Sequence, residues 1–499
     1  MSDSALRRPG RSVFALSLLL TGGITLWALA FRPSFTAVSD AVFRFLTTHF
    51  DWLYMLAMVV FVVFAAVIAC SRWGSIRLGD DGDRPEYSTL SWFAMLFGAG
   101  MGVGLVFWGI SEPISHFVAP MSGIQPGSDE AADFAIRSCF MHWGFHPWAN
   151  YSVLGLALAY FQYRRHRPAL ISTVLEPLLG TQDSLFKRAV DILAVFATVA
   201  GVVTSLGLGV LQINSGLHDL FGIPVALTVQ IAVICLISVL YISSAVSGID
   251  RGIRFVSNAN LYIALTLMAL AFLVGPRLEI IHTFVNGLGS YLGNFIRDSF
   301  LVHPYGDNSW IIRWRIFYWS WWIAWAPFVG VFIARISKGR TIREFLIGVV
   351  LAPSVGSFVW FAIFGTMGLN LAPEGLLTME EMARIAAAPE SGLFVVLQKY
   401  PMGRLLSLVS LLLLGTFFLT SANSSTYVLS MLTSGGALNP PNRKKVLWGA
   451  VQSVLAIGLL IAGGLKPLQI LSITAAFPFI TIMLSTCVSL VKALRQEPE

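Results

Sequence analysis

Charged residues are scarce in this chain of 499 amino acids. Only 12% of the residues are Asp, Glu, Lys or Arg, about half the share of a soluble protein. This composition excludes an ordinary soluble domain. In place of charge, the chain has apolar runs near the ~20 residues that cross a bilayer as a helix, the plainest at 12–31, 52–70, 139–161, 225–242, 257–275 and 445–464. The sequence therefore predicts an all-α polytopic membrane protein.

Cysteine is also rare, and acid–base residues are nearly absent from the apolar runs. Cys70, Cys139, Cys235 and Cys487 form no CxxC pair, which indicates packing residues and no disulfide framework. An enzyme in the membrane would need converging acids and bases, so we predict no catalytic residues and no cofactor. The net charge of +7 is carried by loops between spans, which argues against nucleic acid as a partner.

Three ionisable residues near the apolar runs need an interpretation. Glu112 stands directly before Pro113 and is interpreted as the end of the third span, in preference to a buried proton carrier. His142 and His146 have the i, i+4 spacing of a metal pair. No third ligand is nearby in sequence and Pro147 follows, so these histidines are predicted to make interfacial hydrogen bonds.

Twelve spans are expected, near 12–31, 52–71, 89–110, 136–163, 188–213, 224–245, 257–275, 312–335, 343–366, 402–433, 445–464 and 467–492. With the N-terminus inside, 22 of the 33 Lys and Arg fall in cytoplasmic segments. Because positive residues mark cytoplasmic loops, both termini are predicted to be cytoplasmic. Between spans, residues 279–300 have the pattern of an amphipathic interfacial helix, and 367–401 are predicted as an outside loop.

Two segments have compositions unusual for an uninterrupted membrane helix. Residues 97–104, "FGAGMGVG", hold four glycines, each costing roughly 1 kcal/mol relative to alanine in a helix. They favour an unwound turn facing a substrate or cation, with close helix packing as the alternative. Residues 416–426, "TFFLTSANSST", gather neutral oxygens, which suit a monovalent cation such as sodium. Ordinary contacts between helices are the alternative reading of that segment.

Aromatic residues gather in two places. Five of the 15 tryptophans lie in residues 314–325, "WRIFYWSWWIAW". At 100° per residue, one arc of this helix carries Trp314, Tyr318, Trp321, Trp322, Trp325 and Phe332. A second cluster, "MHWGFHPWANY", carries Trp143, Trp148 and Tyr151. The two faces either pack together or form a box for a quaternary ammonium, which each ring attracts by roughly 0.5–2 kcal/mol. Such a box needs no carboxylate, and none is evident in sequence near these helices.

Four motifs in order along the chain resemble the betaine/choline/carnitine transporters: "GAGMGVGLVFWGISEP", "HWGFHPWANYSVLG", "FYWSWWIAWAPFVGVFIARISKGRTIREF" and "FFLTSANSS". The resemblance runs from about residue 50 to 490. It implies a leucine-transporter-type fold with two inverted five-helix repeats and alternating access. The implied divisions are an N-terminal tail with two extra helices (1–88), repeat one (89–278), an outside helix and linker (279–311), repeat two (312–492) and a short cytoplasmic tail (493–499).

The resemblance also assigns site residues. The aromatic box would comprise Trp143, Trp148, Tyr151 and Trp322, with Trp321 and Trp325 along the substrate path. The gates would be Phe107 and Phe332. A sodium site would use Gly98, Met101, Phe417, Thr420 and Ser421.

This chain departs from the family pattern at several of these positions. A second family sodium site uses two threonines; Thr198 is present and Phe328 matches another contributor, but Val202 stands at the partner position. Asn423 stands where an Asp is common. Arg313 and Arg315 replace the small or polar residue and the Thr that usually flank the first Trp of the signature.

The function implied by the resemblance is secondary transport without covalent chemistry. It is import of glycine betaine or a related methylated solute by sodium symport, for osmoprotection, across the bacterial inner membrane. The expected partners are the solute, the bilayer and a homotrimer. Alternatives are proton-coupled or exchange transport of choline, carnitine or dimethylsulfoniopropionate. From a different class, a channel or a membrane-embedded enzyme would explain the apolar runs.

Overall fold

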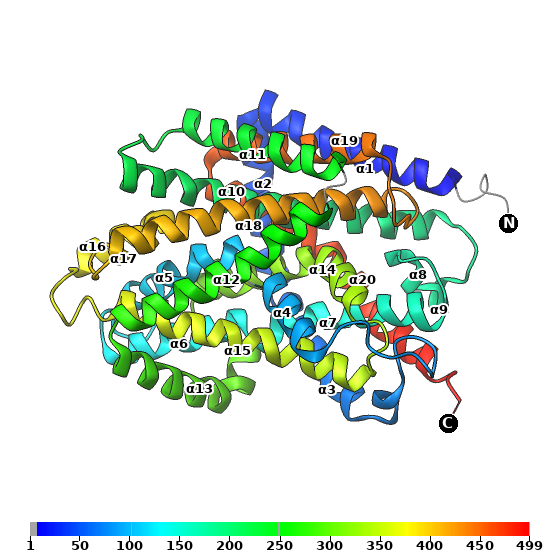
Figure 1. The fold of residues 1–499 in the computed structure, drawn as a ribbon, viewed down its shortest axis with the longest axis horizontal. Helices are drawn as coiled ribbons and strands as arrows, with labels where there is room; N and C mark the ends of the chain where they lie inside the picture. Colours follow the sequence, from blue (N-terminus) through cyan, green and yellow to red (C-terminus); the bar gives the residue numbers. More distant parts are fainter. Residues whose placement is uncertain (1–6, 101, 248–249, 499) are drawn as a thin grey trace.

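The protein is built from helices, many of whose longest members run from left to right across Figure 1. The computed structural model describes residues 7–498 apart from 101 and 248–249, and side chains at 7–11, 97–100, 250–255 and 257–258 are also outside the description. Within the described ranges there is no strand, only an isolated bridge between Arg77 and Thr341. The predicted all-α class is confirmed.

The helices of the first half are α1 (Arg7–Ala30), α2 (Arg32–His49), α3 (Asp51–Cys70), α4 (Thr89–Gly100), α5 (Val103–Val118), α6 (Asp129–Trp143), α7 (Phe145–Ala159), α8 (Ile171–Val174), α9 (Glu176–Leu179), α10 (Leu185–Phe221), α11 (Leu227–Ser247) and α12 (Asp250–Val274). Those of the second half are α13 (Arg277–Ser299), α14 (Phe317–Ile336), α15 (Ile342–Leu369), α16 (Met379–Ala387), α17 (Gly392–Leu397), α18 (Gly403–Leu432), α19 (Asn442–Gly463) and α20 (Leu465–Leu494). Two short π-helical segments, η2 (Tyr160–Arg164) and η3 (Ile311–Ile316), adjoin α7 and α14.

The described residues contain nine helices long and apolar enough to cross a membrane. A tenth candidate is the pair formed by α12 and α13, which is apolar enough when taken together and is bent by 114° between the two helices. Helix α13 is the one predicted to lie along the interface. The remaining two predicted spans are broken pairs, α4 with α5 and α6 with α7. Together these elements occupy all twelve predicted ranges.

Two segments differ from the sequence-based expectation. Helix α2 was not predicted, because Arg32, Asp40 and Arg44 interrupt its apolar residues. The prediction of a loop at 367–401 was wrong, since α16 and α17 form there and α16 begins with a capping box between Thr378 and Glu381. That motif closes a helix end by reciprocal hydrogen bonds.

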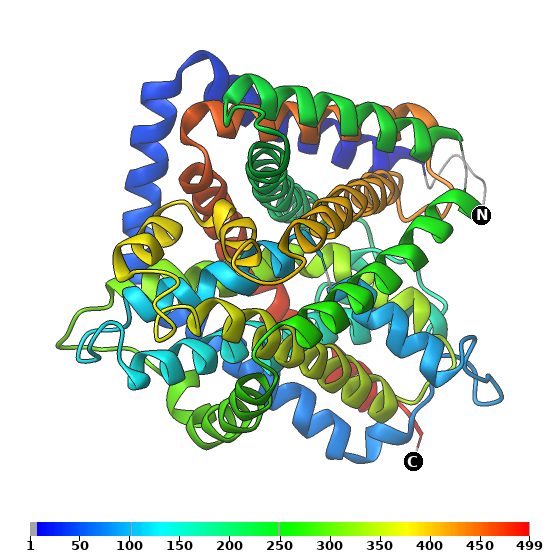
Figure 2. The same cartoon turned by 60° about the vertical axis from the view of Figure 1, so that its left-hand side comes forward.

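Burial separates a central group of helices from a peripheral one. The most apolar stretch of α10 is 89% buried and that of η3–α14 is 83% buried, whereas those of α1 and α11 are each 28% buried. Helix α14 packs along α7 and against α10 and α20. Figures 1 and 2 both show α1, α11 and α19 side by side along one edge. The central helices therefore carry the interior polar groups, while the peripheral ones face lipid.

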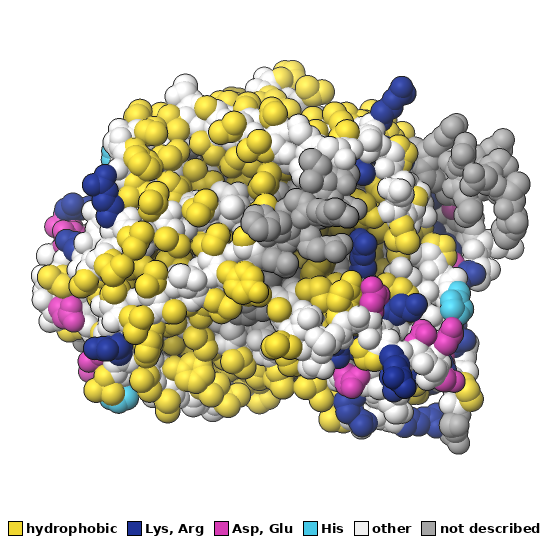
Figure 3. Space-filling view, viewed as in Figure 1, with side chains coloured by type: hydrophobic (Ala, Val, Ile, Leu, Met, Phe, Trp, Pro, Cys, Tyr) yellow, Lys and Arg dark blue, Asp and Glu magenta, His cyan; other side chains and the backbone are white. Residues whose placement is uncertain are grey.

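The surface has an apolar middle between two charged ends (Figure 3). At one end, the loops before α4 and after α14 pair through Leu78 N–H to Arg340 O and Gly339 N–H to Leu78 O, both 2.8 Å. Arg164 joins the same end by ion pairs with Asp81 and with Glu497. Helix α1 begins and α20 ends at this Arg- and Lys-rich end (Figure 1). The segments predicted to be cytoplasmic thus lie together.

Candidate functional site

The glycine-rich motif separates α4 from α5. Gly102 is extended, with φ −128° and ψ −173°, and α5 begins at the next residue. A helix interrupted at membrane depth exposes backbone groups, which are tolerated where they line a cavity. Gly98 lies in α4, and the predicted ligand Met101 lies outside the described residues.

A second break, between α6 and α7, was not predicted. It occurs at Gly144 (φ −95°, ψ −132°), where the prediction had one continuous helix over 136–163. Pro147 cannot donate a backbone hydrogen bond to Trp143, so Gly144 and Pro147 were signals for this break. At this break the carbonyl of His142 accepts a hydrogen bond from Trp322 Nε1 at 2.9 Å. Asn150 Nδ2 donates to the Trp322 carbonyl at 3.0 Å, which fixes this tryptophan from both sides.

Next to the break in α4–α5 is a cavity of about 630 Å³. Its aromatic wall comes from three helices and includes Trp143, Tyr151, Trp321, Trp322, Trp325, Phe328 and Phe332. Trp322 is at the centre of this wall, edge-on to Trp143 at 5.0 Å and to Tyr151 at 5.6 Å between ring centroids. Trp321 stacks on it at 5.7 Å. Aromatic rings from α6, α7 and α14 therefore come together around one cavity, as a binding box for a quaternary ammonium requires.

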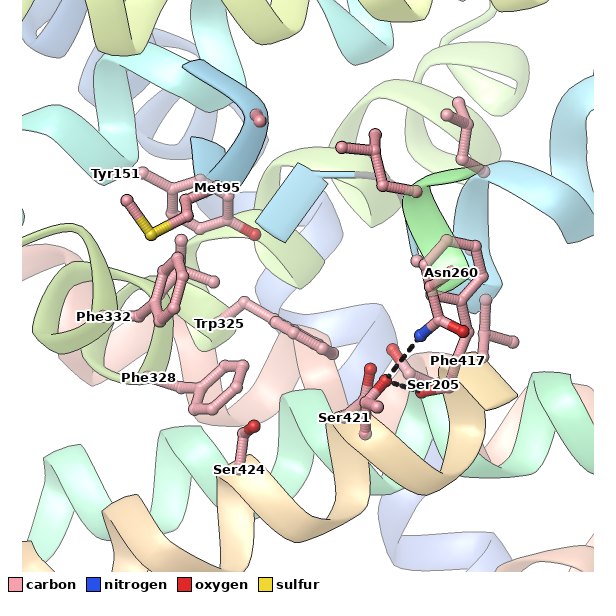
Figure 4. A pocket seen from close by; sticks show the side chains of 18 of the residues that line it. Met95, Tyr151, Ser205, Asn260, Trp325, Phe328, Phe332, Phe417, Ser421 and Ser424 are labelled. Carbon is pink, nitrogen blue, oxygen red and sulfur yellow. Dashed lines mark hydrogen bonds between the residues drawn. The ribbon is translucent and has the colours of Figure 1, made fainter. Parts of the chain in front are cut away.

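The opposite wall carries neutral oxygens (Figure 4). Phe417, Thr420, Ser421 and Ser424 of α18 line it, with Asn260 of α12 and Ser205 of α10. Asn260 Nδ2 donates to Thr420 Oγ1 at 3.1 Å, while Asn260 Oδ1 is buried without a hydrogen-bond partner. The sequence analysis missed Asn260, because a lone amide in an apolar run carries no spacing signal. The donor set, hydroxyl and amide oxygens without a carboxylate, fits a monovalent cation.

Three polar atoms of the aromatic wall lack a partner. Tyr151 Oη, Trp321 Nε1 and Trp325 Nε1 are buried and make no hydrogen bond. Leaving a polar group unsatisfied costs about 1–3 kcal/mol. These donors would be satisfied by a polar group of a molecule bound in the cavity.

Some predicted residues lie behind the cavity wall. Trp148 does not line it but packs edge-on against Tyr151, with centroids 5.5 Å apart. Phe107 is fully buried against Trp108. Thr198 donates its hydroxyl to Ala194 O at 2.8 Å, and Val202 beside it is buried. Trp148, Phe107 and Thr198 can therefore act on a bound molecule only through neighbours or after a rearrangement.

The predicted arc of α14 is shorter than expected. Trp314 lies in the π-helical segment η3, whose wider turn breaks the 100° periodicity on which the prediction rested. It packs edge-on against Trp108 at 5.3 Å, and Tyr318 packs on the same ring at 6.2 Å. Tyr318 also contacts the lining residues Trp143 and Trp321, with ring centroids 5.7 and 6.1 Å apart. Because Trp314 and Tyr318 lie at the end of η3–α14 opposite the loop that follows Ile336, these rings and Phe107 form a second layer that closes the cavity away from the Arg- and Lys-rich loops.

At its other end the cavity extends toward those loops. Tyr87 and Ser91, at the start of α4, and Phe332, near the end of α14, belong to its lining. The cavity therefore communicates with one face of the protein and is closed by aromatic rings toward the other.

The interpretation of Glu112 as a boundary residue was wrong. Pro113 lies inside α5 and does not end it, and the Glu112 side chain is fully buried. Its Oε2 accepts hydrogen bonds from Trp143 Nε1 at 2.9 Å and from Tyr318 Oη at 2.5 Å. A carboxylate thus lies directly behind the aromatic wall, where the sequence analysis saw none.

His142 and His146 bind different partners, and their side chains do not converge on one position where a metal ion could lie. His142 Nδ1 lies 2.6 Å from Glu112 Oε1, whereas His146 Nε2 lies 3.0 Å from Ser299 Oγ and its ring stacks on Trp319. The predicted hydrogen bonds are present, although both histidines are buried in the protein.

Comparison with known proteins gives a consistent result over almost the entire chain. The family model described as "BCCT, betaine/carnitine/choline family transporter" matches residues 12–499. The glycine betaine transporter OpuD of Bacillus subtilis is 44% identical over 97% of this chain and 94% of its own length. A probable glycine betaine transporter of Desulfitobacterium hafniense is 45% identical over 95% of each chain. An ectoine/hydroxyectoine transporter of Virgibacillus pantothenticus is 43% identical over 99% and 98%.

Proposed function

Because this chain belongs to the betaine/carnitine/choline family of transporters, we propose that it imports glycine betaine by sodium symport. It is a transporter and not an enzyme, and it is embedded in the membrane by many spans. The observation that carries the proposal is the cavity with two chemically different walls. Aromatic faces attract the trimethylammonium group, and the unpaired N–H and O–H donors suit the carboxylate. The neutral oxygens of α18 suit sodium.

The mechanism follows from the uneven closure of the cavity. Both termini are proposed to be cytoplasmic, so the open end faces the cytoplasm and the structure corresponds to an inward-facing state. Outward opening requires the rings of Phe107, Trp108 and Trp314 to separate. Sodium bound between α4 and α18 would stabilise the outward state, because its ligands come from both helices. Inward opening would separate the two helices and release both solutes.

Uptake into proteoliposomes tests the proposal. We expect labelled glycine betaine to accumulate when an inward sodium gradient is imposed, and not when potassium replaces sodium. Accumulation driven equally well by a proton gradient in the absence of sodium would refute sodium symport. Exchange against internal betaine without any gradient would point to the antiport alternative.

Ectoine is a second candidate substrate, because one relative of nearly equal identity is an ectoine/hydroxyectoine transporter. Ectoine is also a zwitterion with a delocalised cation, which aromatic faces can attract. Competition separates the two solutes: we expect unlabelled betaine to inhibit labelled betaine uptake at lower concentration than ectoine. The reverse order would reassign the preferred substrate.

Gly104 gives a test of the cavity geometry. A Cβ at this position would lie 2.5 Å from Trp321 Cη2, too close for that rigid indole to remain in place, and 3.2 Å from Trp143 Cη2, a tight contact that shifts the second indole slightly. We expect Gly104→Ala to lower betaine uptake at least tenfold with normal amounts of protein in the membrane. Gly23→Ala, on α1, is the matched control, since no atom lies within 4 Å of its Cβ and Gly23 does not line the cavity. Equal uptake by both variants would contradict the arrangement of Trp143 and Trp321.

A homotrimer is proposed from family membership. Helix α13 exposes the apolar side chains Leu278, Ile281, Val285, Leu292 and Ile296, which could contact a neighbouring copy. Native mass spectrometry of the detergent-extracted protein would give the number of chains. A monomer at all detergent concentrations would refute the trimer.

A further inference from the structure

Glu112 is a buried carboxylate that the proposed transport cycle has not used. It lies on α5, is fully buried, and contacts the aromatic wall through Trp143 and Tyr318. We propose that Glu112 supplies negative charge behind Trp143, so that the aromatic box selects a cationic head group over a neutral group of the same shape. This inference rests on the proposed function, because it assumes that the box holds a trimethylammonium group.

Hydrogen bonding identifies the ionised form of Glu112. Arg315 Nε can only donate, and it donates to His142 Nε2 at 3.1 Å. His142 must then carry its proton on Nδ1, which faces Glu112 Oε1 at 2.6 Å. By the same reasoning, Trp310 Nε1 donates to His116 Nδ1 at 3.3 Å, so His116 Nε2 is the protonated nitrogen facing Oε1.

Glu112 therefore accepts four hydrogen bonds. His116 and His142 donate to Oε1, and Trp143 and Tyr318 donate to Oε2. A carboxylate has about four acceptor positions and, once protonated, would have to donate from one of them. Because His116, His142, Trp143 and Tyr318 each donate to the carboxylate, these surroundings are complementary to its ionised form.

The countercharge is placed on the side away from the cavity. The His142 imidazole separates Arg315 from Glu112. Arg315 Nη1 donates to the Asp298 carbonyl at 2.6 Å, and the Asp298 carboxylate pairs with Arg137 at 3.0 Å. The chain of charges thus has its negative end at Glu112, beside Trp143, and its positive charges farther along the chain, at Arg315 and Arg137. This orientation presents an anion, and no cation, to the box.

The negative charge of Glu112 attracts a cation in the cavity across the Trp143 indole. Trp143 belongs to the aromatic wall of the cavity and is edge-on to both Trp321 and Trp322. Its N–H is bonded to Glu112, so the indole lies between the anion and the cavity. Low-dielectric surroundings screen the carboxylate poorly, and its attraction for a cation adds to that of the ring faces. We expect a contribution of about tenfold in affinity.

The test compares two ligands that differ only in charge at one atom. In 3,3-dimethylbutanoate, carbon replaces the nitrogen of glycine betaine, which leaves shape and carboxylate unchanged. Dissociation constants for both would be measured on the purified full chain in sodium by isothermal titration calorimetry. We expect the wild type to prefer betaine, the preference to fall about tenfold in Glu112→Gln, and Glu112→Asp and Tyr318→Phe to retain most of it.

A second variant guards against misfolding of Glu112→Gln. Arg315→Thr removes the countercharge, places a residue usual in the family at this position, and should raise the preference for betaine. A purely structural role would weaken both ligands equally and leave their ratio unchanged; that result in either folded variant would overturn the inference while the proposed function stands. A wild type that binds neither ligand would refute both.

Discussion

Replacing Trp322 by leucine is expected to lower betaine uptake at least 100-fold. Trp322 contacts three other rings of the aromatic wall and is held by hydrogen bonds to His142 and Asn150. Its loss removes one ring face, whose attraction for the ammonium group is worth roughly 0.5–2 kcal/mol. It also allows the neighbouring rings to move out of the positions that bind the solute. A 100-fold change corresponds to about 2.7 kcal/mol. Initial uptake rates in proteoliposomes, at equal amounts of reconstituted protein, give the measurement.

Trp319→Leu is the matched control for Trp322→Leu. Trp319 lies on the same helix, is buried, and stacks on His146 away from the cavity. The substitution leaves a similar void in the core, so both variants should lose comparable thermal stability. Only Trp322→Leu should lose transport by a large factor. Similar losses in both would mean that packing of α14, and not the box, explains the effect.

The second large effect is expected on sodium. Thr420→Val keeps the volume of the side chain but removes a hydroxyl from the oxygen-rich wall, together with the acceptor for Asn260. We expect the sodium concentration for half-maximal betaine uptake to rise at least tenfold. The rate at saturating sodium should fall less, because the aromatic wall is unchanged. A sodium titration of uptake at fixed betaine gives both values.

Thr416→Val provides the comparison for Thr420→Val. Thr416 lies one turn earlier on α18, donates to Leu412 O, and does not line the cavity. The Thr416→Val variant also loses a threonine hydroxyl but keeps all the proposed ion ligands. The sodium concentration for half-maximal uptake by this variant should therefore match that of the wild type. An unchanged sodium dependence in Thr420→Val would remove this threonine from the proposed site.

Periodicity and composition were sufficient for the spans and much of the aromatic wall. Each span is a local property of about twenty residues, and Trp321, Trp322 and Trp325 fall on one face of a regular helix. Trp314 was misplaced because the π-helical turn of η3 shifts the register. Such a turn has no sequence signature that an assumed 100° period could detect.

Glu112 shows where local reasoning failed. Its partners His142 and Tyr318 are 30 and 206 residues away in the sequence. The residues around Glu112 therefore could not predict these two contacts. The following proline favoured a helix end by the usual rule, yet α5 continues through it. Arg315 was noticed only as an unusual residue, and its role depends on the same long-range contacts.

The saturation of Glu112 has a consequence for the energy stored across the membrane. A buried carboxylate commonly serves as a relay that passes protons through a membrane protein. A cell that maintains a proton-motive force must prevent protons from leaking across the membrane by such a relay. Glu112 has no free acceptor position, because His116, His142, Trp143 and Tyr318 all donate to its carboxylate, so a proton arriving there would displace one of these hydrogen bonds. We therefore expect vesicles containing the protein to retain an imposed pH gradient throughout betaine turnover.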